Sequence, residues 1–406
     1  MNAYVKFRKF NKKVVTKKKF VLVIVLLFLA IISSLGTMSV SAEDNGVDVS
    51  NEISQSVNDI VNDIDFSGLE EIVSDLDTLN IFDSSVSDKV SQILSGEYFT
   101  NYSSLFTSIL SIIFVDIREI LPLVFTLLAI GILANLISEF KSDNGSVSDI
   151  VHFVCFSIMI IAVLWVFKDI LEVTSNTLNT ILSQMQIIFP LLITMLTAIG
   201  SLSSVSIYNP LVAVLTTVVG VVFDKLLYPI FIVMFLFSIL GNLTTAVKLD
   251  KFQGFLSSAF KWIVGMVFTL FTGFLSIQGI SAGKFDSVSI KATKFAVKSY
   301  IPIIGSYISD GMDFIVLGSV LVKNTIGLVG ILILLISIIS PVITIVVIKL
   351  ALQLCGSVLE MSSSLKMSNF LSSCSKILIY PIVIILGVAF MYVITIALIM
   401  CTANIF

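Results

Sequence analysis

Four lysines with helical spacing are the residues whose arrangement most suggests a binding surface. They lie seven, three and four residues apart, at Lys284, Lys291, Lys294 and Lys298. A helix would carry all four on one face. A face of this kind attracts anionic lipid headgroups or an acidic partner. A solvated surface helix would show the same spacing, so the pattern alone leaves both possibilities open.

Further candidates follow these lysines, toward a long apolar run at 326–348: Pro302, Gly305, Asp310, Asp313 and Lys323. Pro302 and Gly305 predict a helix break, because proline disfavours the helical conformation in the residue before it and glycine adopts unusual dihedrals. Ionisable groups at membrane depth need protein or water around them. We therefore expect Ile301–Asp313 to be bent and covered by protein.

An adjacent pair of opposite charges, Asp224 and Lys225, interrupts another apolar stretch. Charges inside a membrane are costly and often mark a functional site. A pair that neutralises itself at the membrane surface fits the sequence equally well. Both residues therefore remain candidates.

The sequence lacks the motifs of zinc proteases and ATPases. His152 is the single histidine, and neither an HExxH motif nor a phosphate-binding loop occurs, which argues against a zinc protease and an ATPase. Asp310 and Asp313 belong to one segment, whereas the carboxylates of a catalytic pair face each other from different elements. We predict that the protein is not an enzyme and has no catalytic residue, cofactor or metal ion.

The composition indicates a membrane protein. Of the 406 residues, 57% are hydrophobic and 13% are charged, and the mean hydropathy is +1.07, well outside the range of soluble domains. The net charge of −3 conceals an asymmetry, since residues 1–19 carry eight basic residues and no acid, whereas residues 43–100 carry fourteen acids and one lysine. Three regions are therefore expected: a basic leader, an acidic segment and a nearly uncharged remainder.

The first region, residues 1–42, is predicted to be a signal peptide. It has a basic start, the apolar stretch Phe20–Ile32 and a small-residue cleavage site that ends at Ala42, as such leaders do. An uncleaved first membrane anchor is the alternative. Cleavage would leave the second region, residues 43–110, as a small helical extracytoplasmic segment, in which Ser67 and Glu70 have the spacing of a capping box.

The third region, residues 111–406, is predicted to be an all-α polytopic membrane domain with about seven transmembrane helices. The expected spans are Leu121–Ser138, Ile150–Phe167, Ile187–Ile199, Pro210–Phe223 with the apolar run that ends near Asn242, Trp262–Ile280, Ile326–Ile348 and Leu378–Met400. The amphipathic stretch Lys168–Gln186 is expected to lie at the membrane interface, with a wet passage as the alternative. The short apolar pieces around residues 200–209 indicate either a broken helix or two tilted spans joined by a loop.

The orientation of the spans is ambiguous. The positive-inside rule would place both the lysines of Lys248–Lys261 and the four-lysine face in the cytoplasm. One span, Trp262–Ile280, separates them, so both can be cytoplasmic only if that span is re-entrant. The four-lysine face is the more basic of the two, and we assign it to the cytoplasm.

Several stretches resemble the stage III sporulation protein AE family of endospore-forming bacteria. They are Lys291-Ala-Thr-Lys-Phe-Ala-Val-Lys298, Ile301-Pro-Ile-Ile-Gly305, Leu321-Val-Lys-Asn-Thr-Ile-Gly-Leu-Val-Gly330, Phe189-Pro-Leu-Leu-Ile-Thr194 and Ser276-Ile-Gln-Gly279. The resemblance covers most of residues 60–406. It implies a non-enzymatic membrane subunit of the secretion-like channel complex that links mother cell and forespore and supports forespore development.

The resemblance also implies a location and partners. The protein would lie in the mother-cell membrane that surrounds the forespore, among lipids and the other membrane proteins of the stage III A operon. Across the intermembrane space it would meet a forespore channel protein, while ATP hydrolysis would come from a partner ATPase and no nucleic acid would take part. The family has no agreed catalytic motif, so no site residues are carried over.

A stand-alone secondary transporter for a small solute is the alternative function. Such carriers place broken helices and ionisable residues near the middle of the membrane. The interrupted apolar pieces, the Asp224–Lys225 pair and Lys323 support this alternative. A carrier should transport when reconstituted alone, whereas a channel subunit should be silent without its partners.

Overall fold

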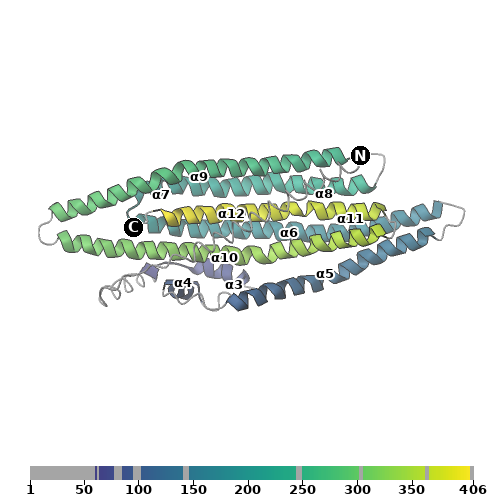
Figure 1. Cartoon of the computed structure of the whole chain (residues 1–406), viewed down its shortest axis with the longest axis horizontal. Coiled ribbons are helices and arrows are strands. Elements are labelled where there is room, and N and C mark those ends of the chain that lie inside the picture. The colour runs from purple at the N-terminus through teal and green to yellow at the C-terminus, as the bar shows by residue number, and fades with distance from the viewer. Residues whose placement is uncertain are drawn as a thin grey trace, which may run out of the picture. The chain divides into compact units, whose positions relative to one another are not determined.

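The computed structural model describes residues 60–61, 64–76, 85–94, 102–139, 146–243, 249–300, 305–361 and 365–402, and its elements in these ranges are helices (Figure 1). The chain divides into two units, residues 1–51 and 52–406, and the described residues belong to the second. The helices are α3 (Ser67–Leu76), α4 (Val86–Leu94), α5 (Tyr102–Glu139), α6 (Ser146–Ala198), α7 (Leu202–Val218), η1 (Val219–Leu227), α8 (Tyr228–Leu243), α9 (Asp250–Tyr300), α10 (Gly305–Met361), α11 (Leu365–Ile377) and α12 (Ile379–Cys401). The predicted signal peptide lies outside the described residues.

Apolar runs of this length form helices because a spanning backbone must satisfy its hydrogen bonds internally. Within the described residues, six stretches are long and apolar enough to cross a membrane. They are Leu110–Ile137, Ile150–Ala198, Leu202–Asn242, Lys251–Leu275, Asp313–Met361 and Leu365–Cys401. The protein is an all-α, multi-pass membrane protein, as predicted, with six candidate spans where about seven were expected.

Three of the helices are much longer than a bilayer is thick. α6, α9 and α10 contain 53, 51 and 57 residues. At 1.5 Å per residue each measures more than about 75 Å, against ~30 Å for a hydrocarbon core. Only part of each helix can therefore lie in the hydrocarbon.

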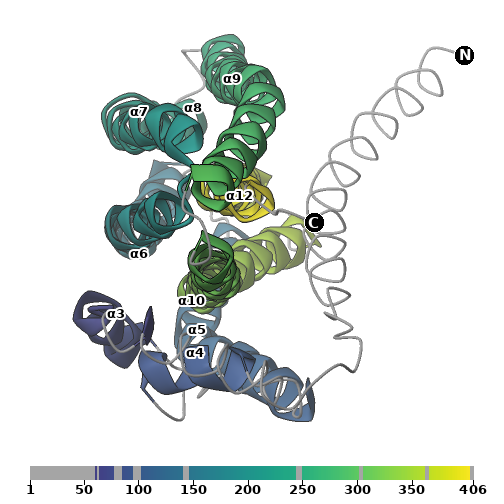
Figure 2. The same cartoon turned by 90° about the vertical axis from the view of Figure 1, so that its left-hand side faces the viewer.

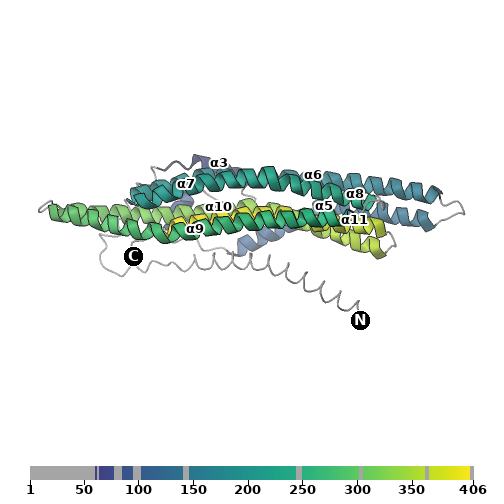
Figure 3. The same cartoon turned by 90° about the horizontal axis from the view of Figure 1, so that it is seen from above.

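The helix α12 lies among α6, α9 and α10 (Figure 2), and most of its side chains are buried. Aromatic pairs connect it to its neighbours. Phe189 of α6 meets Tyr392 edge-on, with ring centroids 5.3 Å apart. The ring centroids of Phe268 of α9 and Phe390 are 6.0 Å apart. α9 and α10 continue together beyond the C-terminal end of α12 (Figures 1 and 3).

The turn between α6 and α7 is three residues long and has the geometry of a Schellman motif. Gly200 has a φ of 86°, which glycine adopts without strain. Its N–H donates to the carbonyl of Thr197 at 2.9 Å, and the N–H of Ser201 donates to the carbonyl of Leu196 at 3.0 Å, so the last carbonyls of α6 are satisfied. Residues 202–209 are helical, so the apolar pieces on either side belong to two long helices joined by a tight turn.

The stretch Lys168–Gln186, expected to lie at the membrane interface, does not form a separate helix. It is the middle of α6, which continues without interruption from Ser146 to Ala198. Its inner face is buried, with Thr177, Ile181 and Gln184 at 5%, 0% and 0% exposure. Tertiary packing buries three of its polar residues, Thr174, Thr177 and Gln184.

The start of the expected bend at Ile301–Asp313 lies outside the described residues. α9 ends at Tyr300 and α10 begins at Gly305, while residues 301–304, including Pro302, lie outside the described residues. From Gly305 onward the chain is regular helix through Asp310 and Asp313, so the prediction of an irregular segment there is wrong. α9 is also continuous, which excludes a re-entrant Trp262–Ile280.

Two short helices precede the bundle. Asp65 caps α3, since its carboxylate accepts the N–H of Ser67 at 3.0 Å, so the cap is not the predicted Ser67. Hydrogen bonds from Ser67 hold the pKa of Asp65 below its ordinary value of 3.8. Leu69 of α3 and Val90 of α4 are fully buried. The acidic segment thus contributes helices that pack on α6 and α10.

Candidate functional site

Lys323 is the most deeply buried charged residue in the described part of the chain. Its side chain has 0% exposure, although it belongs to the candidate span Asp313–Met361. A lysine in such surroundings is costly unless protein groups receive its protons. Its position therefore requires an acceptor from a neighbouring helix.

That acceptor is the carbonyl of Thr402, at the C-terminal end of α12, which receives a hydrogen bond from the Lys323 ammonium. The Thr402 hydroxyl lies 2.7 Å from the hydroxyl of Tyr208 and donates to the carbonyl of Leu398 at 2.7 Å. Tyr208 itself is 1% exposed. Three helices, α7, α10 and α12, thus meet in one hydrogen-bonded cluster.

The cluster balances the lysine with neutral dipoles. Among the residues that the structure describes, no carboxylate lies within ion-pair distance of the ammonium. Ser319, one turn earlier, and Asn324, the next residue, have buried oxygens without a hydrogen-bond partner in the described chain. A buried cation and two unpartnered polar oxygens therefore lie within two turns of α10.

Lys323 begins a face of α10 that points into the bundle. The face consists of Lys323, Gly327, Gly330, Leu334 and Ser337, which we call the α10 seam; all five residues are buried. Their spacing of four, three, four and three is that of a helix–helix contact. The seam combines one charge, two glycines and one hydroxyl within a candidate span.

The two glycines of the α10 seam allow close approach by α12 and α6. A Cβ at Gly327 would lie 2.5 Å from the Sδ of Met400. A Cβ at Gly330 would lie 3.1 Å from Ile188 and 3.3 Å from Ile396, so it would press on two helices at once. Small residues at these positions let the backbones approach, as in other membrane helix pairs.

The seam ends at a second polar contact. The Gln184 side-chain amide donates to the Ser337 hydroxyl at 2.5 Å, and that hydroxyl donates to the carbonyl of Ile333 at 2.8 Å. Ser337 stands at the midpoint of the apolar run Ile326–Ile348. This contact therefore marks the depth at which α6 and α10 meet in the middle of an apolar span.

The outer face of α6 carries another set of polar residues at the same depth. Asn176, Asn179, Ser183 and Gln186, which we call the α6 stripe, are all exposed. Their spacing of three, four and three places them within roughly 80° of one another around the helix. None of the four has a hydrogen-bond partner within the described residues. Sequence reasoning had recognised the polar face but placed it at the membrane surface.

The predicted site residues do not come together. The four lysines lie on the last third of α9, where the side chain of Lys291 is exposed and those of the other three are not described. Asp224 and Lys225 are exposed and lie in η1, a π-helical stretch of the kind that often marks functional positions. Gly305 and Asp310 lie in the first turns of α10, and Asp313, in the same part of the helix, is half-buried.

Sequence analysis did not identify Tyr208 and Thr402 as members of the buried cluster. Tyr208 belongs to a serine-rich stretch and Thr402 follows an apolar helix, so neither carries a local signal. The spacing of the α10 seam was the one available signal, because it joins Lys323 to two glycines and a serine on one face. Among the described residues, no group of three His, Cys, Asp or Glu side chains could hold a metal ion.

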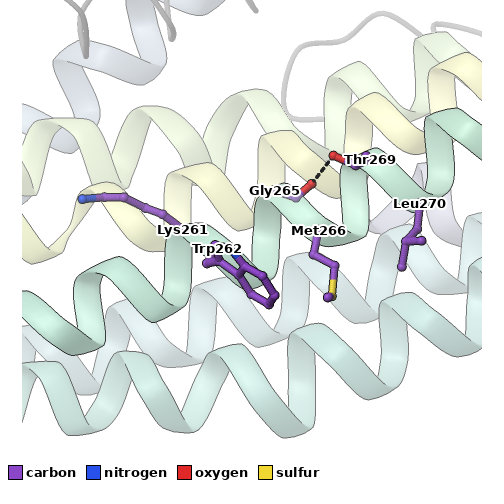
Figure 4. Close-up of a pocket in the computed structure, with 6 residues that line it drawn as sticks. All are labelled: Lys261, Trp262, Gly265, Met266, Thr269 and Leu270. Carbon is purple, nitrogen blue, oxygen red and sulfur yellow. Dashed lines mark hydrogen bonds between the residues drawn. The ribbon is translucent and has the colours of Figure 1, made fainter.

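A shallow hollow lies along α9 (Figure 4). Its volume is about 410 Å³, and it is lined by Lys261, Trp262, Gly265, Met266, Thr269 and Leu270. All six residues come from one helix, and the Thr269 hydroxyl already donates to the carbonyl of Gly265 at 2.8 Å. Ligand sites gather polar groups from several elements, so this hollow lacks the features of a ligand site.

Comparisons with known proteins give one family. The sequence profile of the stage III sporulation protein AE family matches residues 84–403. Stage III sporulation protein AE of Bacillus subtilis (strain 168) is 23% identical over 262 residues, which cover 64% of this chain and 66% of the relative. The chain thus spans about two-thirds of the length of that relative. No solved structure matches the chain.

Proposed function

Because the chain belongs to the stage III sporulation protein AE family, we propose that it is a non-enzymatic membrane subunit of the channel complex that links mother cell and forespore. The observation that carries the proposal is the extent of the match. Residues 84–403 contain all six candidate spans, so the membrane bundle itself is what the chain shares with a sporulation family.

The placement of polar groups supports a role as a subunit. The Asp224–Lys225 pair is exposed near the middle of the candidate span Leu202–Asn242, where lipid cannot satisfy its charges. Exposed polar groups at such positions are expected in a protein whose outer surface is covered by other subunits. A protein that works alone in lipid would have to leave them unsatisfied.

In this proposal the protein lies in the mother-cell membrane around the forespore. Its partners are the other membrane proteins of the stage III A operon and, across the intermembrane space, a forespore channel protein. Energy from ATP would enter through a partner ATPase. The acidic segment would lie between the two membranes.

Purification from sporulating cells tests the proposal. An affinity-tagged chain, extracted in mild detergent, should carry the other A-operon membrane proteins with it. The matched control is the same tagged chain expressed in vegetative cells and mixed with sporulating-cell extract only after solubilisation, which should recover far less. Recovery of the tagged chain alone from sporulating cells would contradict the proposal.

A stand-alone secondary transporter is the second candidate, and the buried cluster around Lys323 favours it. Ionisable residues among unpartnered polar atoms near a tight helix turn are typical of substrate sites in carriers. Reconstitution separates the two functions. Purified protein alone in liposomes should give solute flux that is lost on Lys323→Met if it is a carrier, and no flux if it is a channel subunit.

The four-lysine face of α9 is proposed to act through its charge on the cytoplasmic side. Anionic headgroups attract lysines at about 1 kcal/mol each, so charge reversal should matter more than a change of shape. Replacing Lys291, Lys294 and Lys298 by arginine should leave sporulation normal, and replacing them by glutamate should block it. Failure of the arginine triple would instead indicate a shaped partner site, and normal sporulation of the glutamate triple would rule out both roles.

A further inference from the structure

One line of exposed side chains runs along the outer face of α6, and its character changes once. The line advances in steps of three or four residues, which keep it on one face of a helix. Its first part is apolar and consists of Val154, Ile158, Ile161 and Trp165. Its last part is the uncharged, polar α6 stripe. The charged residues Lys168 and Glu172 lie between the two parts.

The apolar part has the length of the hydrocarbon core of a bilayer. Residues 150–167 contain no Asp, Glu, Lys or Arg. Eighteen residues of helix measure about 27 Å, against ~30 Å for the core. The adjacent end of α5 is similar, since residues 120–138 carry no charge and expose Phe125, Leu133 and Leu136. The outside of this part of α5 and α6 therefore fits lipid.

Charged and aromatic side chains mark the end of this apolar zone. Trp165 is 65% exposed, and one turn later Lys168 forms an ion pair of 3.8 Å with Glu172. On α5, Arg118 and Glu119 are exposed. We call these five residues the belt.

The two halves of the belt are level with each other. The helices α5 and α6 lie side by side at this end of the bundle (Figures 1 and 3), and α5 ends at residue 139 while α6 begins at residue 146. Glu119 is 20 residues before the end of α5, and Lys168 is 22 residues after the start of α6. In an antiparallel pair, residues at similar distances from the connection lie at similar heights.

Beyond the belt, the outside of α6 fits water. Among the described residues, α6 exposes no large apolar side chain after Trp165. The helix α3 packs at this level, where a Cβ at Gly68 would lie 3.1 Å from Ile187. Glu70 and Glu71 of α3 are exposed, and acidic side chains are not stable against acyl chains.

We propose that the belt lies in the phospholipid headgroup layer, where the outer surface of α6 passes from hydrocarbon to water. Residues 120–138 and 150–167 then cross the hydrocarbon, and the α6 stripe and α3 lie in water on one side of it. The inference goes beyond the proposed function and does not depend on which subunits bind.

The chemistry of the belt fits zwitterionic headgroups. Tryptophan gathers at membrane–water interfaces, and the guanidinium of Arg118 matches the geometry of a phosphate. The belt has two basic and two acidic residues, so it can receive both the phosphate and the ammonium group of one lipid class. A headgroup layer therefore satisfies charges that hydrocarbon cannot.

The Asp224–Lys225 pair adjoins the belt. Asp224 of η1 and Glu172 of α6 both lie within electrostatic range of the Tyr228 hydroxyl. A subunit that covers this pair would therefore bind at the surface of the membrane.

Fluorescence quenching tests the depth of the belt. The chain has two tryptophans, so Trp262→Phe leaves Trp165 alone. The full-length variant is reconstituted in phosphatidylcholine vesicles whose acyl chains carry bromine either near the headgroup or near the chain end. We expect bromine near the headgroup to quench Trp165 more strongly. Stronger quenching from the chain end, or none from either position, would overturn the inference.

A matched control moves the fluorophore along the same line of α6. A chain with Trp165→Phe, Trp262→Phe and Ile158→Trp should show the opposite order of quenching, because position 158 lies about 10 Å nearer the middle of the apolar zone at 1.5 Å per residue.

Thiol labelling tests the change from lipid to water. Ile158→Cys and Asn179→Cys lie 10 residues before and 11 residues after Lys168 on the same line, and Glu71→Cys reports the side on which α3 lies. Each is made in the full-length chain with Cys401→Ser, because the other native cysteines are buried. A membrane-impermeant maleimide is added to right-side-out and inside-out vesicles of native membranes.

We expect the cysteines at positions 179 and 71 to be labelled from the same side only, and the cysteine at position 158 from neither side. Labelling at position 158 would place the apolar zone in water and overturn the inference. Protection at position 179 from both sides would show that lipid or another subunit covers the stripe. Labelling at position 179 from both sides would indicate a passage through the membrane, and either result also overturns the inference.

Discussion

The α10 seam and the α6 stripe both carry polar side chains, the seam facing inward and the stripe outward, and the two are level where Gln184 meets Ser337. In the seam, Lys323 and Ser337 have partners on α12 and α6, and glycines bring those partners close. In the stripe, amides and a hydroxyl have no partner in the described chain. The difference indicates that the seam stabilises the fold of one copy, whereas the stripe adds no hydrogen bond to that fold.

The two regions should therefore respond differently to substitution. Changes in the seam should lower the free energy of unfolding of the isolated chain. Changes in the stripe should leave that free energy unchanged. The first three predictions below test this separation, and a fourth concerns the start of α3; they run from the largest expected effect to the smallest.

Gly330→Leu should have the largest effect. The added side chain would meet Ile188 and Ile396 on two different helices, and overpacking of this kind costs about 3 kcal/mol. Thermal unfolding of the detergent-purified chain measures the loss. The matched control is Gly265→Leu on α9, where an added Cβ meets nothing within 4 Å. Equal stability of the two variants would show that α6 and α12 do not close on Gly330.

Ser337→Ala should cost about 1 kcal/mol, the usual worth of an interhelical hydrogen bond in a membrane protein. The change leaves the amide of Gln184 without its acceptor, and the Oε1 atom of Gln184 is already buried without a partner. Adding Gln184→Met should restore most of the stability, because it removes both orphaned groups. A double variant no more stable than Ser337→Ala would show that the two residues are not coupled.

Asn176→Leu and Gln186→Leu should change the unfolding free energy of the solubilised monomer by less than about 0.5 kcal/mol, as surface changes do. The same denaturation assay serves here, with Ser337→Ala as the positive control. A loss as large as that of Ser337→Ala would mean that the stripe packs within its own chain. The contrast between seam and stripe would then fail.

Acidification should destabilise the first turn of α3, which Asp65 caps. Hydrogen bonds from Ser67 lower the pKa of Asp65 below 3.8, so its contribution to the cap is fully present above that pH. The contribution is lost as the pH falls through the lower folded-state value. Amide hydrogen exchange at Leu69 and Val73 should speed up in this range. Asp65→Asn, which keeps a capping oxygen without a titrating group, should not show the change.

The sequence predicted the all-helical class, because the composition alone indicates a membrane protein. It did not predict how long the helices are. The polar stretch in the middle of α6 looked like a gap between spans, yet Gln184 and its neighbours are buried against α10. Hydropathy measures each residue alone and cannot register that a partner helix covers one face.

Only part of the candidate site was predicted from the sequence. Lys323 stood out because a charge in an apolar run is conspicuous. Tyr208 and Thr402 did not, since their roles arise only when α7 and α12 pack against α10. Such partners are decided by tertiary packing, and no local pattern in the sequence contains them.

The order in which the chain is made gives the bond between Lys323 and Thr402 a further consequence. The two residues are 79 positions apart. At about 5–20 residues per second, the ribosome adds Thr402 roughly 4–16 s after Lys323. During that interval the ammonium has no acceptor from α12. Gly330 then faces Ile188 of α6 but not yet Ile396 of α12. Insertion of α12 is thus the step that closes the bundle, and a nascent chain interrupted before it would expose a charged, open groove to quality-control proteases of the membrane.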